Sequence, residues 1–171
     1  MQLDLSRLHQ GLNHFSRVLP PDDVGQEGEA YRVAEPVHVD MQIHKDKERF
    51  RLVGTVRTRL ELPCSRCLEP FSLPIDSAVD LRYLPVEAAE GGDSDREVSE
   101  EDLDAAVYRD DRIDVNELLR EQFYLALPMK PLCREDCAGL CPQCGTNRNT
   151  GTCTCTPQWE DPRLAPLKRL I

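Results

Sequence analysis

The sequence predicts an α+β protein with an antiparallel β-sheet body, one or two packed helices and a cysteine-rich C-terminal appendage. Three observations support this prediction. Apolar and polar residues alternate between residues 31 and 84, apolar residues recur at three- and four-residue steps between residues 114 and 127, and six of the eight cysteines lie between residues 133 and 155. We therefore expect a body over residues 1–128 and an appendage over residues 129–171.

The alternation is clearest in three segments, which we interpret as half-buried antiparallel strands: residues 37–44, 49–62 and 71–83. A polar turn over residues 45–48 joins the first two segments. The last two are joined by a C-x-x-C turn, so we expect Cys64 and Cys67 at the tip of a β-hairpin.

An N-terminal helix is predicted over residues 4–19, where apolar residues recur at helical spacing. Asp4 or Ser6 is suited to cap its first turn, although Gly11 is unfavourable within a helix. The two prolines that follow Leu19 would end this helix.

Three further elements are predicted beyond the sheet. Residues 106–108 favour a short strand. Asp114 and Glu117 resemble a capping box, and the apolar face after them predicts a helix that ends at Pro128 and packs on the apolar side of the sheet. Near the C-terminus, an Asp-Pro pair at residues 161–162 favours a short final helix.

The negative charge is concentrated in one segment. The formal net charge is -10, and residues 87–111 contain eleven Asp or Glu against two Arg, which leaves about -1 for the rest of the chain. Residues 87–104 are acidic and lack periodicity, so we expect a flexible loop there. The overall acidity therefore does not exclude nucleic-acid binding by the folded parts.

The spacing of the cysteines is typical of metal sites. Cys141 and Cys144 form a C-P-x-C-G knuckle, and Cys153 and Cys155 follow after a short loop. A zinc ion binds four thiolates at tetrahedral corners, and a C-x-x-C turn presents two of them. We predict two zinc ions, which makes the appendage a zinc-knuckle appendage packed on the hairpin tip. The first site would contain Cys64, Cys67, Cys133 and Cys137, and the second site Cys141, Cys144, Cys153 and Cys155.

Other uses of these cysteines are weighed against zinc. Disulfides are the first alternative. Residues 1–10 do not resemble a signal peptide, and no run approaches the about 20 apolar residues of a membrane span. We therefore expect a cytoplasmic protein, in which thiols stay reduced. A thioredoxin-like pair would open a helix, whereas Cys67 precedes a strand-like run. An iron–sulfur cluster also binds four cysteines, so the metal stays open. Cys133 and Cys137 could also compete for the second site.

Four stretches of the chain together resemble a known family. They are a C-S-R-C-L-E-P-F turn, a helix ending L-A-L-P, a C-A-G-L-C-P-Q-C-G knuckle and a D-P-R-L-A-P-L end. In this order they resemble the bacterial YceD family, from about residue 31 to the C-terminus and more loosely before it. Its members are described as large ribosomal RNA subunit accumulation proteins. The resemblance implies a cytosolic, non-catalytic role in the accumulation or processing of 23S ribosomal RNA.

The two predicted sites differ in how widely the resemblance implies them within the family. The cysteines of the first site match the more widespread part of the family pattern. Those of the second site belong to the form of the family that has a longer tail. It carries over no catalytic residues.

The first functional hypothesis is binding to ribosomal RNA or a pre-ribosomal particle. Its evidence is an outward row of arginines on one strand, joined by one at the hairpin tip: Arg49, Arg51, Arg57, Arg59 and Arg66. Guanidinium groups at strand spacing suit phosphate contacts. The alternative is cross-strand pairing with Asp40, Asp76 and Asp80. Aromatic residues make up 5%, which disfavours base stacking and favours a duplex or a ribosomal protein as partner.

Two hypotheses of other classes remain. A metal-dependent nuclease is disfavoured, because the sequence has no G-x-x-x-x-G-K or H-E-x-x-H motif and four-thiolate sites leave no position for water. We therefore expect no enzyme and no small-molecule substrate. The third hypothesis is a protein-interaction adaptor whose acidic loop holds a basic ribosomal protein.

Overall fold

The computed structural model describes residues 1–24, 30–86 and 105–155, and its chain divides into two compact units. We call the first the sheet unit; it contains Met1–Leu62 and Phe71–Met129. The second is the cysteine unit, which contains Pro63–Pro70 and Lys130–Ile171. The cysteine unit thus combines the tip of a hairpin with the C-terminal part of the chain. The acidic loop predicted for residues 87–104 and the helix predicted from residue 161 lie outside the described residues.

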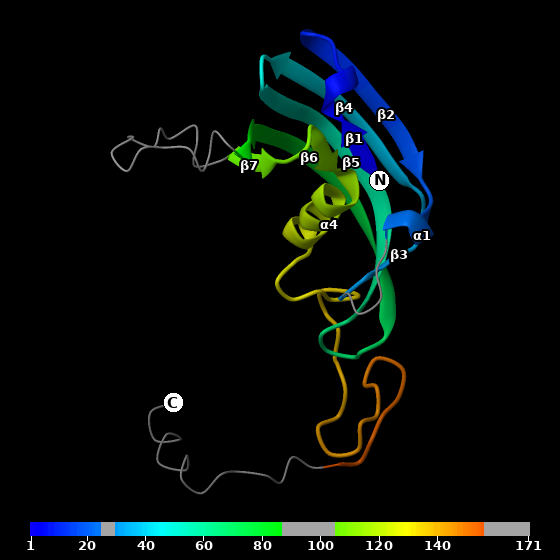
Figure 1. The fold of residues 1–171 in the computed structure, drawn as a ribbon. Helices are drawn as coiled ribbons and strands as arrows, with labels where there is room; N and C mark the ends of the chain where they lie inside the picture. Colours follow the sequence, from blue (N-terminus) through cyan, green and yellow to red (C-terminus); the bar gives the residue numbers. More distant parts are fainter. Residues whose placement is uncertain (25–29, 87–104, 156–171) are drawn as a thin grey trace, which may run out of the picture. The chain divides into compact units, whose positions relative to one another are not determined.

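The sheet unit is built on a mixed sheet in the order β2-β4-β5-β6-β7 (Figure 1). Its strands are β2 (Gly11–Leu19), β4 (Val37–Asp46), β5 (Arg49–Pro63), β6 (Pro70–Pro85) and β7 (Ala105–Tyr108). A short strand, β3 (Arg32–Val33), pairs antiparallel with β5. β2–β4 and β4–β5 are antiparallel, whereas β7 runs parallel to β6. The predicted α+β class, the three long strands and the short strand near residue 106 are therefore confirmed.

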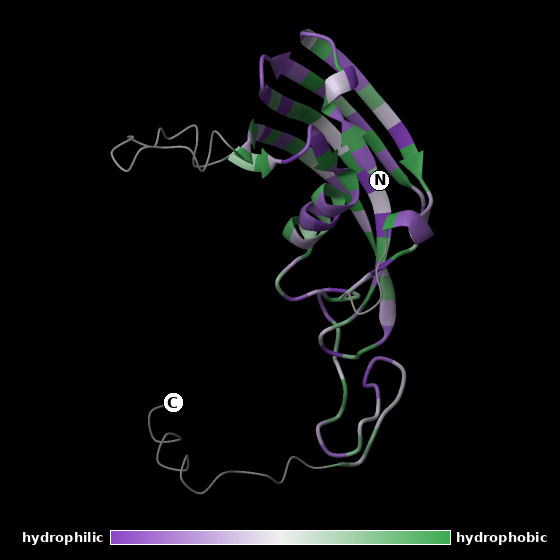
Figure 2. Cartoon of the chain, in the orientation of Figure 1, coloured by the Kyte–Doolittle hydropathy of each residue, from purple (hydrophilic) through white to green (hydrophobic). Residues whose placement is uncertain are grey.

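One face of this sheet carries the core. Along β4 every second side chain is buried, and Figure 2 shows the same alternation of apolar and polar residues along the strands. The buried residues of the three long strands are Val37, Val39, Met41, Ile43, Phe50, Leu52, Val56, Leu60, Leu62, Ile75, Val79 and Tyr83. They form one cluster with residues of the main helix. The predicted inward faces are thus correct.

The main helix, α4 (Val115–Ala126), begins at the predicted cap. The Asp114 carboxylate accepts hydrogen bonds from the backbone N–H groups of Asn116 and Glu117, at 2.8 and 3.4 Å. Its buried face contributes Val115, Leu118, Leu119 and Phe123 to the core. The preceding strand β8 (Arg112–Asp114) pairs antiparallel with β1 (Gln2–Asp4). No helix in the described part of the chain is long and apolar enough to cross a membrane.

The predicted N-terminal helix is wrong. Residues 4–19 instead finish β1, make a 3-10 turn (η1, Leu5–Arg7) and form β2, and the short helix α1 (Pro21–Val24) follows. Pairing with β4 over nine residues decides the conformation of β2, and Gly11 starts it with φ of 90°. Lys45 of β4 donates to the carbonyl oxygens of Leu5 and Leu8, both at 3.1 Å. Sheet pairing thus overrides the helical spacing, which is a weak signal beside tertiary contacts.

Gly54 allows β4 and β5 to approach closely. A Cβ atom at this position would overlap the carbonyl oxygen of Asp40 and lie 2.6 Å from the Cα of Met41, which faces Gly54 across the strands. Because both contacts are backbone atoms, no side-chain movement would relieve them. Glycine is therefore required at position 54 because the backbones of β4 and β5 approach closely there, and not because of an unusual φ.

Candidate metal centres

The first centre begins at the hairpin turn between β5 and β6. The turn is closed by two backbone hydrogen bonds of 2.9 Å, from the Cys64 N–H to the carbonyl of Glu69 and from the Leu68 N–H to the carbonyl of Cys64. Leu68 has φ of 62°, a left-handed conformation that is uncommon for leucine. The turn thus holds Cys64 and Cys67 on one side of a tight loop.

The structure brings the four cysteines of the predicted first site together. Their sulfur atoms all lie within 4.8 Å of one another. The sulfurs of Cys64 and Cys137 are 3.7 Å apart, and those of Cys67 and Cys133 are 3.8 Å apart. Metal–sulfur bonds of about 2.3 Å at tetrahedral corners place two sulfurs about 3.8 Å apart. The arrangement therefore fits a single tetrahedral ion.

Arg66 joins the hairpin turn to the C-terminal segment within the cysteine unit. Its backbone N–H points at the Cys64 sulfur, 3.5 Å away, and its guanidinium donates to the Cys137 carbonyl at 2.8 Å. The Leu140 N–H in turn donates to the Arg66 carbonyl at 3.1 Å. Gly139 has φ of 70°, and a Cβ atom there would lie 3.0 Å from that same carbonyl oxygen. Arg66, for which RNA contact was predicted from its charge and its place at the hairpin tip, thus also shapes the first site.

The second centre is local in sequence, as predicted. The sulfurs of Cys141, Cys144, Cys153 and Cys155 also lie within 4.8 Å of one another. The knuckle is closed by a 2.9 Å hydrogen bond from the Gly145 N–H to the Cys141 carbonyl, and Gly145 adopts φ of 72°. The hydroxyl of Thr146 lies 3.1 Å from the Cys144 sulfur. Glycine at this position permits the left-handed turn that a side chain would strain.

The pKa values of the cysteines diverge within each centre. In the first site burial opposes ionisation of Cys64, but hydrogen bonds from the backbone of Cys67, Cys133 and Arg66 lower its pKa to about 6. The pKa of Cys133 is raised to about 12 by desolvation of its sulfur and by the neighbouring sulfurs. Four adjacent thiols thus resist losing all their protons, and a cation among them would remove that resistance.

The second centre repeats this division. Backbone N–H groups of Cys144 and Gln143 lower the pKa of Cys141 to about 6. The Cys144 sulfur, together with burial, raises the pKa of Cys155 to about 12. Hydrogen bonding and charge attraction from the Cys141 sulfur raise the pKa of the Arg148 guanidinium, which therefore lies where it offsets thiolate charge. The sequence did not predict that Arg148 lies beside the second centre. The polar composition of its loop was the signal that could have suggested such a contact.

The outward arginines of β5 differ in their partners. Arg51 forms two hydrogen bonds with Asp80, at 2.8 and 2.7 Å. Arg57 pairs with Asp76 and Arg59 with Glu35, both at 3.2 Å. Arg49 forms no ion pair with another described residue. Asp40, the third carboxylate expected to pair with this row, instead contacts His14 at 3.1 Å.

Comparison with known proteins identifies the family. Residues 52–171 match the family described as "Large ribosomal RNA subunit accumulation protein YceD". The chain belongs to the YceD family. The matched residues include both cysteine centres. No solved structure matches the chain.

Three relatives illustrate the range of the YceD similarity. A chloroplastic YCED homolog 1 of Zea mays is 32% identical over 155 residues, covering 78% of this chain and 53% of the relative. An uncharacterised protein of Mycobacterium tuberculosis is 30% identical over 149 residues, covering 85% of this chain and 69% of that protein. YlbN of Bacillus subtilis is 23% identical over 175 residues, covering 100% of this chain and 96% of that protein. The chain spans about half the length of the chloroplastic relatives it matches.

Proposed function

We propose that this chain is a non-catalytic accessory protein of ribosome biogenesis that supports the accumulation or processing of large-subunit (23S) ribosomal RNA in the cytoplasm. Membership of the YceD family, over a match that includes both cysteine centres, is the observation that supports it most strongly. The name of the Zea mays relative, a large ribosomal RNA subunit accumulation protein, points the same way.

A depletion experiment tests this role in cells. Loss of the protein is expected to lower the amount of 23S relative to small-subunit ribosomal RNA, and the wild-type chain to restore it. A variant with Cys64→Ser and Cys67→Ser should fail to restore it, because the first site would lose two of its four ligands. An unchanged ratio of the two RNAs after depletion would contradict the proposal.

Zinc is the metal that we propose for both centres. Four thiolates at the corners of a small tetrahedron leave no position for water, which is the pattern of structural zinc sites. Sulfurs this close suit one ion better than a cluster, in which the four cysteines are divided among two or four iron atoms. Elemental analysis of protein purified without added metal is expected to give two zinc atoms per chain. Iron in place of zinc would contradict the assignment.

RNA contact is proposed at one end of the outer sheet face. His44, Arg49, Arg51 and Arg82 line a shallow hollow of about 180 Å³. Asp80 faces two of these arginines: hydrogen bonding to Arg51 and the charge of Arg82 lower its pKa. Even with Asp46 in the hollow, positive charge exceeds negative charge there. A concave positive surface favours the phosphates of structured RNA.

The other end of the same face provides a matched control. There, Arg57 and Arg59 are each paired with a carboxylate. We expect Arg49→Gln with Arg82→Gln to weaken binding of large-subunit RNA and to reduce the salt slope by about one for each phosphate-binding arginine removed. Arg57→Gln with Arg59→Gln should have a smaller effect. Equal effects of the two pairs, or an unchanged slope in both, would contradict this location.

A basic ribosomal protein is the second candidate partner, because eleven acidic residues lie between residues 87 and 111. A concentrated negative charge attracts basic proteins and speeds their association. Deletion of residues 90–104 is expected to weaken such a partner while RNA binding stays intact or increases. Capture of basic ribosomal proteins that is unchanged by the deletion would exclude this candidate.

A further inference from the structure

One loop of the second centre reaches the first centre. Residues 146–152 connect the two halves of the second site, Cys144 and Cys153. Within this loop the backbone N–H of Arg148 donates to the Gly139 carbonyl at 2.9 Å. Gly139 lies between the last cysteine of the first site and the first cysteine of the second. The loop is therefore attached to the segment that connects the two centres.

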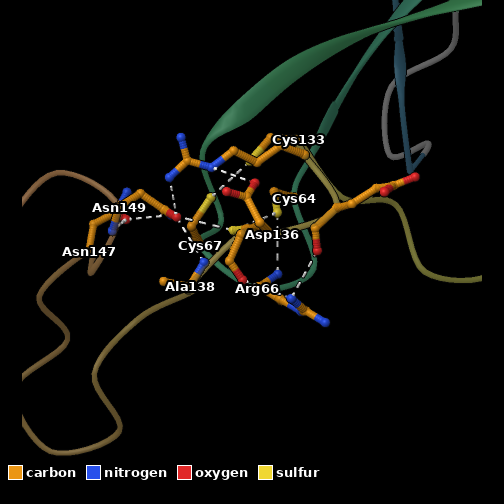
Figure 3. Close-up of polar contacts among 11 residues, drawn as sticks. Cys64, Arg66, Cys67, Cys133, Asp136, Ala138, Asn147 and Asn149 are labelled. Atoms are coloured by element: carbon orange, nitrogen blue, oxygen red, sulfur yellow. Dashed lines mark hydrogen bonds and ion pairs between the residues drawn. The ribbon is translucent and has the colours of Figure 1, made fainter.

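Asn149 makes the direct contacts with the first centre (Figure 3). Its side-chain amide donates to the Cys137 sulfur at 3.3 Å. Its side-chain oxygen accepts from the backbone N–H of Ala138 at 2.8 Å and from the guanidinium of Arg134 at 2.7 Å. Both neighbours follow a cysteine of the first site directly in sequence. One side chain of the second centre's loop thus contacts one sulfur and two flanking residues of the first.

Asn147 fixes the orientation of Asn149. Its side-chain oxygen accepts from the backbone N–H of Asn149 at 3.0 Å and from the Asn149 amide at 2.8 Å. The backbone N–H groups of Thr150 and Gly151 donate to the Asn147 carbonyl, at 3.2 and 2.9 Å. This compact turn aims the Asn149 amide at the sulfur of the first centre.

We propose that Asn149 couples the two metal centres, so that filling the second raises the metal affinity of the first. Residues that hydrogen-bond to metal ligands typically change metal affinity about 10–100-fold when they are mutated. An ion bound by both halves of the second site would hold the two ends of the loop that supplies Asn149. Reciprocity of binding free energies then requires that the first site affect the second equally.

This inference rests on the proposed metal binding, and a second physical route competes with it. Cys137 and Cys141 are joined by three residues, so ordering one site also orders the segment that leads into the other. That route needs no Asn149. An experiment must therefore separate coupling through the side chain from coupling along the backbone, which a double-mutant cycle does.

The test measures the first site's affinity for Co²⁺ by competition with a chelator, in four reduced proteins. They are the wild type, Asn149→Ala, a chain lacking the second site through Cys144→Ser and Cys155→Ser, and the combination of all three changes. In wild-type background, loss of the second site is expected to lower first-site affinity about 10-fold. In the Asn149→Ala background the same loss should have little further effect. Thr152→Ala, an exposed change in the same loop, should leave the full 10-fold difference.

Each other outcome overturns the inference. An equal loss in both Asn149 backgrounds would assign the coupling to the backbone, and no loss in the wild type would mean that the centres are independent. Native mass spectrometry supplies a second readout: the wild type should load from zero to two ions with little singly loaded protein, whereas Asn149→Ala should accumulate it. Failure of the wild type to bind two ions would instead contradict the proposed metal sites themselves.

Discussion

The sheet unit and the cysteine unit are stabilised by different interactions. In the sheet unit, strands and α4 bury a continuous apolar cluster that includes Leu52, Leu60 and Phe123. In the described part of the cysteine unit, the buried apolar side chains are themselves cysteines: Cys64, Cys67, Cys137 and Cys141. One unit thus has a hydrophobic core, and the other has four-cysteine centres in its place.

Typical magnitudes explain why both solutions work. A fully buried large apolar side chain contributes about 1.5–3 kcal/mol, so a core needs many of them. Structural zinc contributes about 10–16 kcal/mol in small domains, so two ions can order a segment that has almost no core. The order of the cysteine unit should therefore depend on bound metal, whereas the fold of the sheet unit should not.

Metal removal tests this difference most directly and should have the largest effect. A strong chelator under reducing conditions is expected to abolish order in the cysteine unit and to leave the sheet unit folded. Amide hydrogen exchange reports both at once. Protection should be lost at Leu140 and Gly145, whose N–H groups donate within the cysteine unit, and kept along β4 and β5.

Restoring the metal provides the control for this prediction. Addition of stoichiometric zinc is expected to restore protection at the same amides, because the sulfurs regain their shared ion. Loss of protection along β4 and β5 after chelation would contradict the comparison, since it would make the sheet unit metal-dependent as well.

Much of the sheet unit could be predicted from the sequence, and its N-terminus could not. In β4 the alternation of Val39, Met41 and Ile43 with polar residues leaves one buried face, and the structure has that face. In residues 4–19, Leu8, Leu12 and Phe15 are spaced as on a helix, but pairing with β4 determines a strand. Strand pairing between distant segments is not encoded in local spacing, which explains the error.

The candidate centres were predictable for a related reason. C-x-x-C spacing places two sulfurs on one turn whatever surrounds it, so the second site follows largely from short-range geometry. The first site joins distant segments and was predicted by elimination, because Cys133 and Cys137 were the cysteines left for Cys64 and Cys67. The contacts of Asn149 and Arg148 depend instead on the conformation of a loop that contains no cysteine. The charge of Arg66 suggests RNA contact, and its guanidinium also donates to a backbone carbonyl, a contact that the sequence does not show.

A substitution within the sheet unit tests whether its stability is independent of the metal in the cysteine unit. Gly54→Ala is expected to lower the free energy of unfolding by about 1–3 kcal/mol or more, because the added Cβ overlaps backbone atoms of β4. Thr55→Ala, the adjacent control, should cost less. Chemical denaturation measures both, and elemental analysis should still find the wild-type metal content. Metal loss from the folded Gly54→Ala protein would contradict the independence of the two units.

Proton release gives the smallest effect and concerns the cysteine unit alone. The pKa values of Cys64 and Cys141 are lowered to about 6, whereas those of Cys133 and Cys155 are raised to about 12. At pH 7 metal binding to a cysteine unit that keeps this fold without metal would release between about two and three protons per ion. Binding to the disordered unit expected after chelation should release close to four. Calorimetry in buffers of different ionisation enthalpy measures this number.

The pH dependence of metal binding follows with a definite sign. A thiol whose pKa is lowered on folding contributes stability that is present above its unfolded pKa, near 9.0, and lost as the pH falls through about 6. Below about pH 6 these thiols also bind protons, so every ligand must then lose a proton to the solvent when it binds the metal. For a unit that stays folded without metal, metal affinity would consequently fall more steeply with acidification below pH 6 than above it. A release of about four protons per ion at pH 7 is expected if chelation disorders the cysteine unit. A release of only two or three would mean that backbone hydrogen bonds hold Cys64 and Cys141 as thiolates before the metal arrives, which would contradict that loss of order.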